Sequence, residues 1–157
     1  MDAIVLLLAM IDQAYDKKSW HGSNLKGSIR GISAKEAAWR PSAGRHGIAD
    51  LVLHAAYWKY ICRRRLLGEE KGSFDRKGSN WFTLPTPYTD AQWKADTKLL
   101  DETHRSLRAA IAKLKPGDLT YQPASSRVSN WAQLTGIAAH DLYHAGQIQY
   151  VKALLRK

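Results

Sequence analysis

The sequence has very little cysteine: Cys62 is the only one in 157 residues. A single thiol cannot form an internal disulfide, and it excludes the cysteine clusters that hold structural zinc or iron–sulfur groups. This scarcity suits a reducing compartment. With 45% hydrophobic and 24% charged residues, the chain has the balance of a globular protein that buries a core without covalent staples.

Long hydrophobic runs are missing as well. The apolar stretch from Ala3 to Ile11 is far shorter than the roughly 20 residues that a membrane-spanning helix needs. Asp2 is the only early charge, so the stretch lacks the basic leader of a secretory signal, and no small-residue cleavage site follows it. We interpret the stretch as the start of a buried helix, and we expect a cytoplasmic protein without a membrane partner.

Acidic residues are scarce too, since 14 aspartates and glutamates stand against 24 lysines and arginines, giving a formal net charge of +10. A basic balance can indicate nucleic-acid binding, but here the basic residues are scattered. Their densest run, Arg63–Arg65, falls at a predicted helix end, where the helix dipole favours cations. No RNA-recognition motif, zinc-finger spacing or glycine-rich clamp is visible. We therefore expect no specific nucleic-acid partner, because charge alone gives only non-specific affinity.

Helical periodicity dominates the chain, and no segment shows the sustained alternation of a strand. Gly68 and Pro116 mark helix ends, whereas Thr89 has the position of a helix cap. A short helix is predicted after Ser33, where Ser-Ala-Lys-Glu has the form of a capping box, and Pro41 ends it. The long helices are predicted over residues of about 2–18, 47–67, 90–114 and 130–157.

Two connections lack this periodicity: a glycine- and serine-rich stretch over 20–32 and a long loop over about 69–88. Long loops without secondary structure of their own are uncommon and are often functional. This one contains Phe74, Trp81 and Phe82, which indicate that it packs against the body of the protein. The pattern as a whole predicts an all-α fold, a single domain over 1–157 built as an antiparallel four-helix bundle with one long crossover loop.

His140 and His144 lie four residues apart in the last predicted helix. This spacing places both imidazoles on one face, one turn apart, and that face is otherwise apolar. Burying two unpaired imidazoles is costly, whereas a metal ion would satisfy both. The pair approximates the His-Glu-x-x-His pattern of zinc peptidases, although Asp141, in the place of the glutamate, is one methylene shorter.

A third ligand must come from upstream, because no His, Asp, Glu or Cys follows His144. His54 is the best candidate, since it lies on the core-facing stripe of the second long helix, between Leu51 and Trp58. Three neutral imidazoles leave open positions on a metal, as in catalytic sites, and they suit one divalent ion of zinc, nickel, iron or manganese. The alternative for each histidine alone is a hydrogen-bonded core residue.

Other polar residues near these positions are weaker candidates. Asp50 and Gln147 each lie about one turn from a candidate ligand and are predicted to orient it through hydrogen bonds. His46 and His104 are interpreted as loop or surface residues. His21 stays ambiguous, because it could face a metal pocket or merely cap a helix.

The two histidine segments resemble the DinB-like superfamily of four-helix metalloproteins. Residues 139–148, Ala-His-Asp-Leu-Tyr-His-Ala-Gly-Gln-Ile, are similar to its closing motif, and residues 48–58, Ile-Ala-Asp-Leu-Val-Leu-His-Ala-Ala-Tyr-Trp, are similar to its first-ligand helix. Residues 20–25 and 87–93 are similar to family segments as well. The resemblance implies a right-handed bundle, often a homodimer, with one metal ion on His54, His140 and His144.

Some members of that superfamily are thiol S-transferases or isomerases that use bacillithiol or mycothiol. The resemblance therefore implies a metal-dependent S-transferase acting on a small thiol and a small electrophile, with His21 and Asp141 as weak candidates for a general base. Two alternatives stay open: a non-catalytic metal-binding protein of the stress response, and a metal-dependent hydrolase. The superfamily name refers to DNA-damage induction and does not imply DNA binding. We expect the segments 69–88 and 20–25 to border the entrance to the site.

Overall fold

The computed structural model describes residues 2–70 and 72–156. Within these ranges all regular structure is helical, apart from an isolated bridge between Ser79 and Trp81. No helix of the described residues is long and apolar enough to cross a membrane. The all-α fold predicted from the sequence is confirmed. Its elements are α1 (Ala3–Tyr15), α2 (Leu25–Ser28), α3 (Ala34–Ala38), α4 (Ile48–Leu66), α5 (Asp90–Ile111), the 3-10 helix η1 (Pro116–Thr120) and α6 (Asn130–Leu155).

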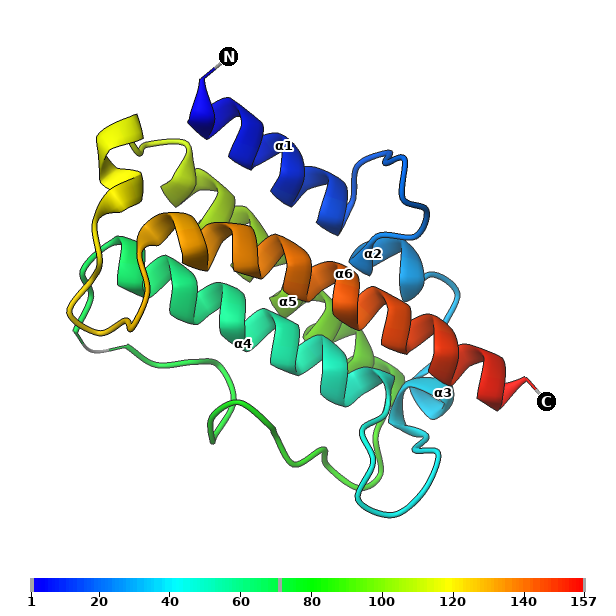
Figure 1. Cartoon of the computed structure of the whole chain (residues 1–157). Coiled ribbons are helices and arrows are strands. Elements are labelled where there is room, and N and C mark those ends of the chain that lie inside the picture. Colours follow the sequence, from blue (N-terminus) through cyan, green and yellow to red (C-terminus); the bar gives the residue numbers. More distant parts are fainter. Residues whose placement is uncertain (1, 71, 157) are drawn as a thin grey trace.

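The four long helices α1, α4, α5 and α6 form the bundle, and α2 and α3 cover one end of it (Figure 1). Helix α4 packs against both α5 and α6, whereas α1 packs mainly against α6. The crossover loop between α4 and α5 leads the chain back along the bundle, so that α5 runs parallel to α4 while α6 runs antiparallel to it. The two histidine-bearing helices, α4 and α6, are therefore direct neighbours.

The helix ends follow the signals in the sequence. Ser33 and Glu36 form a reciprocal capping box, in which the Ser33 N–H donates to Glu36 Oε2 at 2.8 Å. The side chains of Thr89 and Ser129 accept hydrogen bonds from the first turns of α5 and α6. Gly68 has a φ of 66°, a left-handed conformation that glycine adopts without strain, and it ends α4.

Some bounds differ from those predicted. Helix α2 lies inside the stretch expected to be irregular, because Asn24 Oδ1 accepts a hydrogen bond from the Gly27 N–H at 2.8 Å and so begins a helical turn. Helix α1 ends at Tyr15 and α5 at Ile111, each about three residues earlier than predicted. These are shifts of one turn at helix ends and leave the packing face of each helix unchanged.

The buried core has two parts along the bundle, separated by a polar layer. Leu100 of α5 belongs to one part and Leu107 to the other, and His104 lies between them. The expectation that His104 is a surface residue was wrong: it is 3% exposed, because it continues the buried stripe of α5 at helical spacing. Its ring stacks on Tyr15 with the centroids 3.7 Å apart.

A buried ion pair completes the polar layer. Lys59 of α4 donates to Asp141 of α6, and their side chains are 0% and 1% exposed. The Lys59 ammonium also lies 5.0 Å from the centroid of the Tyr15 ring. This pair joins the two helices that carry the candidate ligands, at a level next to His140.

Candidate metal centre

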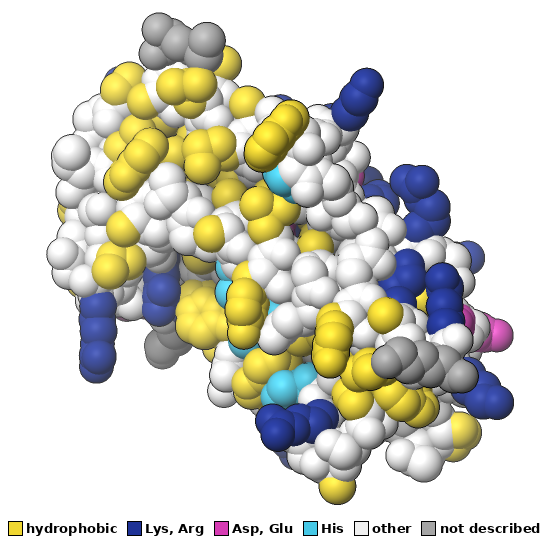
Figure 2. Space-filling view, turned by 45° about the vertical axis from the view of Figure 1, so that its right-hand side comes forward, with side chains coloured by type: hydrophobic (Ala, Val, Ile, Leu, Met, Phe, Trp, Pro, Cys, Tyr) yellow, Lys and Arg dark blue, Asp and Glu magenta, His cyan; other side chains and the backbone are white. Residues whose placement is uncertain are grey.

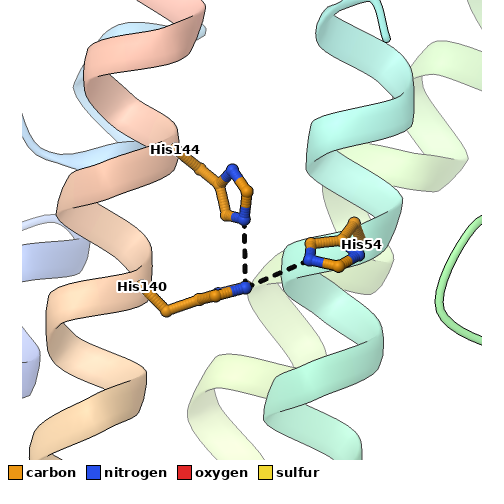
Figure 3. A group of neighbouring side chains, drawn as sticks. All are labelled: His54, His140 and His144. Carbon is orange, nitrogen blue, oxygen red and sulfur yellow. Dashed lines mark hydrogen bonds between the residues drawn. The ribbon is translucent and has the colours of Figure 1, made fainter.

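The three histidines singled out from the sequence lie together in the structure. His54 extends from α4 toward His140 and His144 of α6 (Figure 3). Nε2 of His140 lies 3.1 Å from Nε2 of His54 and 3.0 Å from Nε2 of His144, and all three candidate ligand atoms lie within 4.8 Å of one another. Antiparallel packing of α4 on α6 brings the side chains together across 86 residues of sequence.

The hydrogen bonds of the Nδ1 atoms fix which ring nitrogen of His54 and of His144 carries the proton. Nδ1 of His54 is 2.9 Å from the backbone oxygen of Asn80, and Nδ1 of His144 is 2.6 Å from Oε1 of Gln147. Both oxygens accept, so both imidazoles carry their single proton on Nδ1 and direct an Nε2 lone pair toward His140. A proton on Nε2 of His140 can satisfy only one of these lone pairs. Hydrogen bonding alone therefore leaves the cluster one donor short.

A divalent cation resolves this shortage, and the spacing fits one. Because zinc–nitrogen bonds are about 2.0–2.1 Å long, two imidazole nitrogens on one ion are about 3.0–3.4 Å apart. The observed separations of 3.0 and 3.1 Å match that range. Nδ1 of His140 is buried without a hydrogen-bond partner among the described residues, so that ring is held by its helix and by packing.

Burial also keeps these imidazoles neutral. Desolvation, together with smaller effects of the neighbouring His144 and His54, lowers the pKa of His140 to about 3. Desolvation likewise lowers the pKa of His144 to about 4, against the opposing effect of its bond to Gln147. The pKa of His54 is lowered by the same cause. Near neutral pH all three therefore offer unprotonated nitrogens, the form that binds metals.

Asn80 is a support that the sequence analysis missed. Its φ of 64° is left-handed, a conformation that asparagine tolerates better than most residues. Its backbone oxygen holds His54, while its side-chain Oδ1 accepts from Trp58 Nε1 at 2.9 Å. The crossover loop is thus attached to α4 at two points and orients a candidate ligand. The sequence could not indicate this contact, because a backbone carbonyl makes it across 26 residues.

The two supports that were predicted have different outcomes. Gln147 does bond to His144. Asp50 forms no hydrogen bond with His54; it accepts from the Gly47 N–H at 2.8 Å and from the Arg40 guanidinium at 2.8 and 2.9 Å. The first turn of α4 needs an acceptor for its free N–H groups, and Asp50 supplies it.

Comparison with known proteins identifies the family of the chain and a similar fold. The family model of the DinB superfamily matches residues 19–148, which include all three histidines. The chain belongs to the DinB superfamily. The crystal structure of a conserved protein from Enterococcus faecalis is similar in fold, with a TM-score of 0.70 and 16% sequence identity over 98% of this chain and 97% of that chain. No curated protein matches the chain.

A cavity of about 890 Å³ opens beside the histidines of this DinB superfamily member. Figure 2 shows histidine side chains in a hollow between hydrophobic ones. The crossover loop borders it through Trp81, as expected, but the segment 20–25 does not. The loop 41–46 takes that place, and its His46, although exposed, stacks on Trp81 with the centroids 3.6 Å apart.

Neither candidate for a general base reaches the histidine cluster. His21 is exposed and lines a separate cavity with Leu142 and Ala145 of α6. Asp141 is fully buried in its ion pair with Lys59. Because Lys59 holds this carboxylate, Asp141 is not free to act as the glutamate of the zinc peptidases does, and the analogy fails at this residue.

Proposed function

We propose that this DinB superfamily protein is a metal-dependent thiol S-transferase in which His54, His140 and His144 hold one divalent ion of zinc, nickel, iron or manganese. The observation that carries the proposal is the convergence of three neutral Nε2 atoms that lack enough protons to satisfy one another. A small thiol and a small electrophile are the proposed substrates. An ion bound there lowers the pKa of a coordinated thiol and so supplies a nucleophile near neutral pH.

The residues around the histidines support an open rather than a closed site. No aspartate, glutamate or cysteine is among the described residues that line the cavity, and Trp81 lies stacked between its further histidine, His46, and His54. No fourth protein ligand from the described residues therefore reaches the cluster from that side. Asn80 and Gln147 hold two of the imidazoles in one tautomer and orientation. Trp81 covers one face of His54, with ring centroids 4.0 Å apart, and excludes water from it.

We also propose a homodimer and a single domain spanning residues 1–157. The exposed side chains of Val5, Leu6 and Met10 on α1 support an apolar contact between copies. Light scattering at micromolar concentration should give twice the chain mass of 17.6 kDa. A mass of one chain would contradict the dimer and leave the metal site unaffected.

Metal analysis tests the ligand assignment. Protein purified without an affinity tag should contain about one divalent ion per chain, and His140→Ala should lose most of it, because two nitrogens bind such an ion far more weakly than three. His21→Ala is the matched control, since His21 lines a different cavity, and it should keep the metal. Full occupancy in His140→Ala would show that the assignment is wrong.

A turnover screen separates the three functional classes. Metal-dependent consumption of bacillithiol, mycothiol or glutathione with an electrophile supports the S-transferase, whereas metal-dependent cleavage of simple esters indicates a hydrolase. In cobalt-substituted protein an open site should change its visible spectrum when a thiol is added. A spectrum indifferent to thiols, together with a large fall in melting temperature on metal removal, would establish a structural ion instead.

A further inference from the structure

The cavity beside the three histidines carries charge of one sign. Arg45 is the only lysine, arginine, aspartate or glutamate among the described residues that line it. Its side chain is exposed, and none of the ion pairs of residues 2–70 and 72–156 involves it. In the face shown by Figure 2 the acidic side chains lie at the edge, away from the hollow. A guanidinium in such surroundings favours an anionic ligand, which it can hold through two parallel hydrogen bonds.

Much of the remaining wall is formed by aromatic and aliphatic side chains. Both faces of the Trp81 ring are covered, by His54 at 4.0 Å and by His46 at 3.6 Å between centroids, so this ring can offer a ligand only its edge. Tyr143 and Tyr150 on the α6 side are 64% and 69% exposed and offer open ring surface. Such surfaces bind flat apolar groups by stacking and by burial of area.

We propose that this cavity binds a small organic anion with an aromatic or similarly flat body. The negative group pairs with Arg45, and the body lies against Tyr143 and Tyr150 and the apolar side chains of Leu51 and Val151. The volume of about 890 Å³ is within the range of small-molecule sites, and the net charge of +10 adds long-range attraction. This inference names the substrate class of the site and rests on the function proposed above.

Calorimetric titration of the metal-free protein tests the inference without any turnover. The ligands are naphthoate, its neutral isostere naphthamide, the cation naphthylmethylammonium, and acetate, which has the charge but no ring. Naphthoate should bind about tenfold more tightly than naphthamide, the difference expected for a charge-assisted hydrogen bond, and more tightly than the cation or acetate.

Two variants locate the binding, and each has a matched control. Arg45→Met should abolish the preference for naphthoate over naphthamide, whereas Arg127→Met removes the same charge from an exposed site outside the cavity and should preserve it. Tyr150→Ser should weaken both naphthyl ligands several-fold, whereas Tyr121→Ser, at a side chain that is 62% exposed elsewhere, should not. Because the four side chains are exposed, the variants should keep the wild-type circular dichroism.

Several results would overturn the inference. Equal affinity for naphthoate and naphthamide, or tighter binding of the cation, contradicts the anionic class. If acetate binds as tightly as naphthoate, the ligand does not need an aromatic body. If Arg45→Met keeps the preference for naphthoate over naphthamide, the anion does not bind at Arg45. Thiol turnover with no preference for anions overturns this inference and leaves the S-transferase standing. Conversely, Arg45-dependent naphthoate binding without any thiol turnover supports the inference and refutes the S-transferase.

Discussion

Replacement of Lys59 by methionine should destabilise the protein more than a typical core substitution. The Lys59 and Asp141 side chains are 0% and 1% exposed, and they pair with each other across α4 and α6. Methionine keeps most of the apolar stem but removes the ammonium. The carboxylate of Asp141 is then left buried without its cation: Oδ2 loses the bond from Lys59, and Oδ1 has no hydrogen-bond partner among the described residues.

The expected cost follows from this geometry. Removing one partner of a buried ion pair costs about 3–5 kcal/mol, a large part of the roughly 5–15 kcal/mol by which domains are stable. For a urea dependence of about 2 kcal/mol per molar, the unfolding midpoint should fall by about 2 M. The double variant Lys59→Met/Asp141→Leu removes both charges and should recover most of the loss, because apolar residues of similar size can replace a buried pair.

Urea denaturation of metal-free protein, followed by circular dichroism, measures these free energies. Metal-free conditions separate the effect of the ion pair from any effect on the neighbouring His140. The reasoning is refuted if Lys59→Met costs less than about 1 kcal/mol, or if the double variant is less stable than the single one, since either result would mean that the carboxylate does not depend on Lys59.

Three further predictions follow. Gln147→Leu removes the acceptor for His144 Nδ1 and should weaken zinc binding about tenfold, whereas the control Gln149→Leu on the same helix should not. Competition with a chelator measures the zinc affinity of both variants, and equal affinities of the two would contradict the role of Gln147. Asn80→Ala strains the left-handed backbone that Asn80→Gly tolerates, so the alanine variant should bind zinc more weakly than the glycine variant in the same assay. Burial lowers the pKa of His104 from 6.5 to about 3, so below about pH 6.5 the unfolded chain binds a proton that the folded protein does not, and this residue should lower the free energy of unfolding by up to about 1.4 kcal/mol per pH unit. In metal-free protein His104→Phe should reduce this pH dependence, and an unchanged slope would contradict the reasoning.

Helix positions could be predicted from the sequence because their signals are local. Ser33, Gly68 and Thr89 mark helix ends through contacts within a few residues, and all three do so in the structure. The same local rules placed His140 and His144 on one face of one helix. His54 was linked to that pair by its place on a buried stripe and by the family resemblance, and the packing of α4 on α6 does bring the three rings together.

The residues that orient and surround the histidines depend on tertiary contacts, and there the sequence was a poor guide. Asn80 acts through its backbone oxygen, an atom that every residue has and that no motif can mark. Asp50 lies one turn from His54, as predicted, but hydrogen-bonds to the start of its own helix. The helical spacing of His104 does mark it as buried, but the Tyr15 ring on which it stacks comes from a helix far away in sequence.

X-ray absorption at the zinc edge tests the central claim most directly, because it counts the ligands of the bound ion. The zinc-loaded protein should show three imidazole nitrogens per ion, oxygen from solvent and no sulfur, since Cys62 is buried and is not part of the histidine cluster. After addition of a small thiol, one sulfur ligand should appear while the three imidazoles remain. An ion with fewer than three imidazoles, or one that never acquires sulfur, would contradict a three-histidine centre that activates a thiol.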